Sequence, residues 1–384
     1  MKKENNGFIK FFITTIGITI IAIVLRELSH IFIPLIIAFF LYFFFEPLNN
    51  FLESKKIPGL FITLLDIAIT ILILYTVGRV IFDSFVQFSE GFPEYSKKLS
   101  EIVRNVSKDL GIKDPFFRYF SFEKLVKSID LQSLAGGLFT STMDLLGSVL
   151  FVLFFFVFVL SGEKNIYEAI KSYYIKKKVK PELKKILEEK SGDTENNIQN
   201  ELKVELNQIK IQKETELENT FKEITIQIQK YIITKFLINL LAGGITTLSL
   251  HLYGLDYPVI WGLFVFLFNF IPTIGSAAAL ILPVLFSAVQ FDSLSSTLFV
   301  LIIMIIIQTV AFNVAEPMVI GNRLNLNPLI ILLSVLIWGY IWGIVGMLLS
   351  VPITAIIKII ISNSKSENLV FLSDIMSQKR GTRV

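Results

Sequence analysis

One uncharged stretch limits what this chain can fold into. It runs from Tyr257 to Val289, a length of 33 residues, and contains no Asp, Glu, Lys or Arg. An unbroken helix of that length would be about 50 Å long, whereas the hydrocarbon core of a bilayer is about 30 Å thick. A single straight spanning helix is therefore a poor description, and we expect the stretch to be broken.

The residues from 269 to 275 predict where the break falls. Pro272 lacks a backbone donor and clashes with the preceding helical turn, while Gly275 lets another backbone come close. Asn269 and Thr273 place polar atoms where polar atoms are costly, and on a helix they would share one face. Freed backbone groups in a membrane need cover from protein or water. We therefore expect these four residues to line a translocation path, which a bulky side chain at position 275 would fill.

A second long apolar stretch runs from Pro328 to Ile361, with Lys358 as its only charge. Its small and helix-breaking residues are Gly339, Gly343, Gly346 and Pro352. Paired, interrupted hydrophobic segments are the best sequence pointer to a transporter's binding site. We expect these residues to line the same path, with Gly343 and Gly346 opposite the first break. The alternative is that both stretches are kinked, closely packed spans with no part in transport.

Composition supports a membrane protein. Hydrophobic residues make up 53% of the 384 residues, and the mean hydropathy is +0.66. Several apolar runs exceed 18 residues, which predicts an all-α polytopic membrane protein with about eight hydrophobic segments, two of them broken or re-entrant, plus helical extramembrane regions. There is no cysteine, so disulfides, iron–sulfur clusters and thiol nucleophiles are excluded. The two histidines are far apart in sequence, so we expect no histidine-rich metal site and no cofactor.

Hydropathy and charge divide the chain into six predicted regions. They are membrane helices one to three (1–83), extracytoplasmic amphipathic helices (84–137), membrane helix four (138–160), a charged cytoplasmic helical region (161–229), a C-terminal membrane core with both broken segments (230–362), and a cytoplasmic tail (363–384). Within the charged region a stripe of apolar residues at helical spacing includes Leu217 and Phe221. This stripe either joins subunits of a homo-oligomer or packs on its own protein.

Basic residues near the membrane ends predict the topology. Lys2 and Lys3, Lys55 and Lys56, the lysines at 176–180 and the tail should be cytoplasmic, which places 84–137 outside. If both broken segments span, there are eight spans; if both are re-entrant hairpins, there are six. Both counts are even, so both termini are predicted to lie on the cytoplasmic side of a bacterial cytoplasmic membrane. The net charge of +4 is small and of mixed sign, so we expect no nucleic-acid partner.

Two motifs resemble a known family. The first is Asn269-Phe270-Ile271-Pro272-Thr273-Ile274-Gly275, followed by Pro283; the second begins at Glu316-Pro317, includes Gly321, Arg323 and Pro328, and continues through Gly339, Gly343 and Gly346 to Pro352. Both are similar to signatures of the autoinducer-2 exporter family of bacterial permeases. The resemblance covers the whole chain in hydropathy order and is specific from about Tyr231 onward. It implies an inner-membrane permease that forms homo-oligomers and exports small signalling molecules, with sodium–proton exchange in some members.

The chain departs from that family in two places. Tyr231 is followed by Ile232, Ile233, Thr234 and Lys235 instead of the family's frequent Gly-Gln, and the preceding charged region is longer than usual. Both departures bear on the cytoplasmic entrance and on the choice of substrate.

Three charged residues are candidates for ion coupling. Asp66 lies inside an apolar run, where a carboxylate suggests a functional site, although Lys55 or Lys56 could pair with it at the interface. Glu316 precedes Pro317, where a helix must loosen, and could pair with Arg323 or bind a cation or proton.

The sequence contains no pattern typical of an enzyme or an ATPase. It has no nucleophile elbow, HExxH or Walker A motif. We therefore predict gradient-driven export of a small molecule, with the lipid bilayer and the solute as partners. A monovalent cation (sodium)/proton antiporter is the first alternative, and a non-transporting membrane scaffold is the second.

Overall fold

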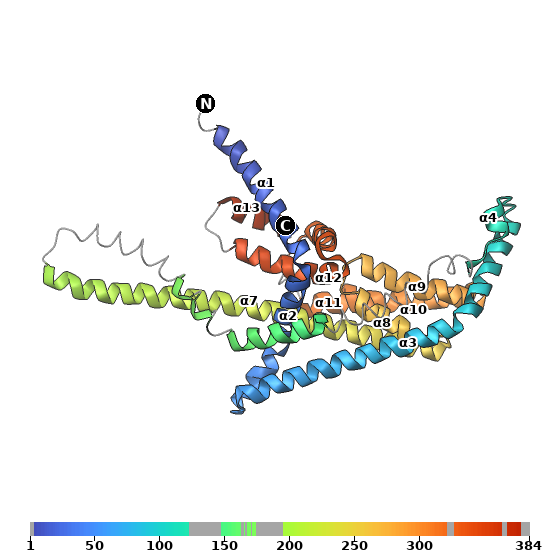
Figure 1. Ribbon diagram of the computed structural model, residues 1–384, viewed down its shortest axis with the longest axis horizontal. Helices are drawn as coiled ribbons and strands as arrows, with labels where there is room; N and C mark the ends of the chain where they lie inside the picture. Colours follow the sequence, from blue (N-terminus) through green and yellow to red (C-terminus); the bar gives the residue numbers. More distant parts are fainter. Residues whose placement is uncertain are drawn as a thin grey trace, which may run out of the picture.

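The computed structural model describes residues 4–122, 147–162, 165, 167–169, 171–173, 195–320, 326–362 and 367–377. The lysines at 176–180, Arg323 and half of the tail (363–366 and 378–384) lie outside these ranges. The main helices are α1 (Glu4–Glu27), α2 (Ser29–Ser54), α3 (Gly59–Asp109), α4 (Pro115–Arg118), α7 (Glu195–Tyr253), α8 (Pro258–Phe268), α9 (Ile274–Phe291), α10 (Leu294–Gln308), the π-helix η1 (Thr309–Ala315), α11 (Glu316–Ile320), α12 (Pro328–Ser362) and α13 (Glu367–Met376) (Figure 1).

The all-α membrane architecture predicted from the sequence is confirmed. Among the described residues, six helices are long and apolar enough to cross a membrane, and a seventh span results if Gly147–Gly162 and Tyr167–Tyr173, bent by 53°, are counted together. The expected count of about eight is therefore close. Large apolar side chains stay exposed along these helices, for example Leu72 at 62% and Leu285 at 60%. Such side chains can face the lipid tails of a bilayer without cost, because lipid tails are as apolar as leucine.

Two very long helices dominate the shape. α7 joins the charged region directly to the C-terminal membrane core and extends well beyond the other elements in Figure 1. α3 is a single helix through Asp109, although the sequence predicts that the region of membrane helices one to three ends at residue 83. Pro93 lies inside α3 without ending it. Of the predicted amphipathic helices in 84–137, the described residues therefore show a continuation of α3 and the short α4.

The first broken segment is a helical hairpin. α8 and α9 lie side by side, with the rings of Trp261 and Phe286 5.1 Å apart, although 25 residues separate them in sequence (Figure 1). At the base of the hairpin, Gln290 accepts a bond from the Asp256 amide and donates one to the Gly254 carbonyl, each at 2.8 Å. The chain therefore leaves and returns at the same end, as the re-entrant alternative requires.

The base of this hairpin is held against the far half of α3. Tyr95 donates a hydrogen bond to the carboxylate of Asp256, and its ring lies 4.7 Å from that of Phe286. A Cβ at Gly91 would lie 1.7 Å from the Tyr257 hydroxyl oxygen, so only glycine lets that phenol approach the α3 backbone.

The second broken segment, α12, folds in the same way. Trp342 and Gly343 leave helical geometry, with Gly343 at φ 61°. The indole of Trp338 donates to the hydroxyl of Thr354 at 3.2 Å, whereas residues 16 apart in a straight helix would be about 24 Å apart. The arms of α12 are therefore antiparallel around the turn at Trp342–Gly343.

The apolar stripe of α7 packs on the chain itself at one point. Phe221 meets the ring of Tyr167 at 5.6 Å, and Lys171 pairs with Glu218 at 3.1 Å. Leu217, which is adjacent to Glu218 and one turn before Phe221, is only 7% exposed. Of the two alternatives drawn from the sequence, internal packing accounts for this part of the stripe.

Candidate functional site

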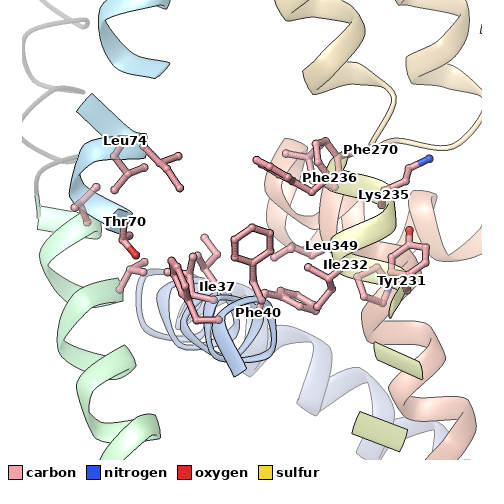
Figure 2. A pocket seen from close by; sticks show the side chains of 18 of the residues that line it. Ile37, Phe40, Thr70, Leu74, Tyr231, Ile232, Lys235, Phe236, Phe270 and Leu349 are labelled. Atoms are coloured by element: carbon pink, nitrogen blue, oxygen red, sulfur yellow. The ribbon is translucent and has the colours of Figure 1, made fainter. Parts of the chain in front are cut away.

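A cavity of about 420 Å³ opens where the membrane helices meet the two hairpins. Figure 2 shows side chains of α2 and α3 facing those of α7 and the first hairpin across an open space. Its lining consists of Ile37, Phe40, Leu41, Phe44, Phe45, Thr70, Ile73, Leu74, Ser148, Val149, Val152, Tyr231, Ile232, Lys235, Phe236, Phe270, Leu348, Leu349 and Pro352. Phe270 comes from the first break, and the last three come from the second arm of α12. Both interrupted segments therefore contribute residues to the lining of the same cavity.

The turn of the first hairpin is closed by the side chain of Asn269. Its amide donates to the carbonyl of Val265 at 2.8 Å, and its oxygen accepts from the Ser276 hydroxyl at 2.7 Å. Asn269 is only 1% exposed. The side chain thus adds a second hydrogen bond to the Val265 carbonyl, which also accepts from the backbone amide of Asn269, and ties the start of α9 to the end of α8.

The other three residues of this break have different positions. Thr273 is exposed at φ 63°, a left-handed conformation that is strained for a β-branched residue. Since α8 ends at Phe268 and α9 begins at Ile274, Asn269 and Thr273 do not share a helix face. Pro272 is half-buried between them.

Gly275 supports the turn by close approach of backbone. A Cβ there would lie 1.7 Å from the carbonyl oxygen of Phe268. Added volume would therefore collide with the hairpin itself before it could fill a path, which corrects the sequence-based expectation for a larger side chain at 275.

The glycines of the second break have a similar structural task. A Cβ at Gly346 would lie 1.9 Å from the carbonyl oxygen of Trp338, and one at Gly339 would lie 2.9 Å from side-chain atoms of Met347. Gly343 provides the positive φ of the turn. At this turn the indole of Trp342 donates to the carbonyl of Leu25, which holds the turn against the end of α1 at 2.8 Å. Pro352 is the member of the predicted set that lines the cavity.

A partly buried ion pair lies beside the cavity, which its lysine helps to line. Lys235 donates to both carboxylate oxygens of Glu316, at 2.9 and 2.7 Å, and the two side chains are 8% and 21% exposed. The ammonium also lies 5.3 Å from the ring centre of Phe312. Glu316 therefore pairs with Lys235 of α7, and the partner considered from the sequence, Arg323, lies outside the described residues.

The helix directly before Glu316 departs from α-helical geometry. Residues Thr309–Ala315 form a π-helix between α10 and α11. Seven residues of π-helix are unusual, because such turns are rare and occur mostly as single turns at functional sites. The preceding Gln308 is 7% exposed, and both polar atoms of its side chain lack a partner among the described residues.

Asp66 is buried near the cavity but does not pair with a lysine. Its Oδ2 accepts from the amide of Asn49 in α2 at 2.9 Å, and the residue is 0% exposed. Its Oδ1 has no hydrogen-bond partner among the described residues. The backbone carbonyl of Asp66 accepts from the hydroxyl of Thr70, which lines the cavity one turn further along α3. Lys55 and Lys56, the partners considered from the sequence, are exposed.

Most of the cavity was not identifiable from the sequence. Its walls are ordinary apolar residues of α2, α3 and α7, which resemble lipid-facing residues until the helices are assembled. Besides Pro352, Lys235 was an available signal, since a charge inside an apolar segment indicates function or a buried partner.

Comparisons with known proteins agree with this architecture. A family model described as the AI-2E family transporter matches residues 11–205 and 202–366. A protein of Haemophilus influenzae, provisionally named a transport protein, is 26% identical over 91% of this chain and 92% of its own length.

Two other relatives match a shorter region. The AI-2 transport protein TqsA of Escherichia coli is 35% identical over 38% of this chain and 43% of its own length. A provisionally named transport protein of Borreliella burgdorferi is 41% identical over 36% of this chain and 39% of its own length. Since the family model covers most of the chain, this protein belongs to the AI-2E transporter family.

Proposed function

We propose that this protein is a permease of the bacterial cytoplasmic membrane and that its export of a small molecule is driven by a gradient and not by ATP. One observation carries the proposal: two interrupted helical hairpins, α8–α9 and α12, border the same cavity. Broken helices at membrane depth occur where protein or a water-filled cavity covers the freed backbone, and in transporters they frame the substrate site. The relative named for AI-2 transport supports a small signalling molecule as cargo.

The proposal is tested by filling the cavity. Leu74 of α3 lines it, whereas Leu72 on the same helix is 62% exposed and does not. Cells lacking the protein should accumulate a metabolite, and wild-type protein or Leu72→Trp should restore its export. Leu74→Trp, inserted at the same level, should not. Equal export by both variants would show that the cavity is not part of the transport path.

A monovalent cation/proton antiporter is the second candidate, and Asp66 is the observation in its favour. A fully buried carboxylate with one oxygen unpartnered among the described residues could exchange a proton for a cation. Sodium-driven proton flux should then occur in proteoliposomes of the wild-type protein and be lost in Asp66→Asn. The wild-type protein should be assayed at an orientation and density that support solute export. If it then shows no sodium-driven proton flux, the antiporter is refuted and the exporter is the remaining candidate.

A further inference from the structure

The lining of the cavity restricts what it can hold. Four of its residues carry a polar group in the side chain, namely Thr70, Ser148, Tyr231 and Lys235. The hydroxyl of Thr70 donates to the carbonyl of Asp66 at 2.8 Å, and Ser148 has an interaction within the protein. The remaining lining residues are aliphatic or aromatic. A hydroxylated solute would therefore find few hydrogen-bond partners.

The one charged side chain among the described lining residues is already neutralised. Lys235 gives two hydrogen bonds to the carboxylate of Glu316. In Figure 2 its carbon chain borders the cavity, and its nitrogen points away from the open space between Phe40 and Leu74. The described part of the lining consequently offers no free opposite charge to an anion or a cation.

A polar occupant would be penalised by these walls. Each hydroxyl that loses its water without gaining a partner weakens binding by roughly 5- to 150-fold. An ionised group would lose more, because nothing in the lining repays its desolvation. An apolar solute gains affinity from the same surface, and about 420 Å³ lies within the usual range for sites of small organic ligands.

We infer that the cavity binds a neutral, predominantly apolar small molecule, and that polyols and free ions are excluded from it. This inference rests on the proposed export function, since it names the class of solute that would be carried. Affinity should follow the apolar area of the solute, with little dependence on salt.

The test uses the full chain in lipid nanodiscs. The probe is a neutral ten-carbon methyl ester carrying a diazirine, and labelled peptides are identified by mass spectrometry after irradiation. We expect saturable labelling of the α2, α3 and α7 peptides that line the cavity. The unlabelled ester should compete, ionised decanoate at least tenfold less well, and ribitol not at all. Leu74→Trp should lower the saturable labelling at least tenfold, whereas Leu72→Trp should leave it unchanged.

Three results would overturn the inference. They are labelling that does not saturate, equal competition by ribitol or decanoate, and labelling of the same peptides by a diazirine phospholipid that the ester does not displace. The last result would assign the cavity to a lipid tail. Failure of the export function is distinguishable, because saturable labelling by the ester would then persist in a protein that restores no metabolite export.

Discussion

The Lys235–Glu316 pair allows a quantitative test of how the hairpin core is held together. Glu316→Gln removes one charge and leaves the ammonium of Lys235 in a site where it is 8% exposed. Breaking a buried pair in this way costs about 3–5 kcal/mol, since the remaining charge is desolvated without a partner. That cost corresponds to a fall of at least about 150-fold in the ratio of folded to unfolded protein. Lys235→Met with Glu316→Gln should recover most of the loss, because no unpaired charge remains.

Unfolding of the purified full chain by denaturant in mixed micelles measures these differences. The matched control is the exposed pair Lys98–Glu94 of α3, at 3.0 Å with side chains 41% and 69% exposed. Glu94→Gln should cost only about 0.3–0.5 kcal/mol. If the two single changes at Lys235 and Glu316 add in the double variant, the groups are not coupled and the argument from burial is refuted.

Three other predictions follow from the geometry. Gly275→Ala should sharply reduce the yield of monodisperse protein because its Cβ would lie 1.7 Å from a backbone oxygen, whereas Gly244→Ala, with no atom within 4 Å, should be normal; equal yields would contradict the close approach. Leu110→Cys should react with an impermeant thiol reagent in intact cells and Lys210→Cys only in opened cells, and the reverse pattern would invert the predicted topology. Leu217→Glu should speed limited proteolysis of the charged part of α7, since that side chain is 7% exposed and is adjacent to Glu218, which pairs with Lys171 of a neighbouring helix; an unchanged rate would argue against internal packing.

Length and hydrophobicity determined the architecture from sequence alone. Runs too long for the bilayer required breaks, and Pro272 and Gly275 placed the first of them within the segment where α8 ends and α9 begins. Gly343 likewise marks the turn of α12, because it is the residue with positive φ there. These features are local: backbone sterics act within a few residues, so the order of residues is enough to predict them.

The tertiary structure alone decided the direction of the breaks and the partners of the buried charges. A proline predicts that a helix is interrupted, but whether the chain continues or turns back depends on packing between residues such as Trp261 and Phe286, 25 positions apart. Asp66 had two lysines nearby in sequence and instead bonds Asn49 of α2, while Glu316 reaches Lys235, 81 residues away. Hydrogen bonds and ion pairs act over a few ångströms in space, so only the folded arrangement of the helices determines which groups meet.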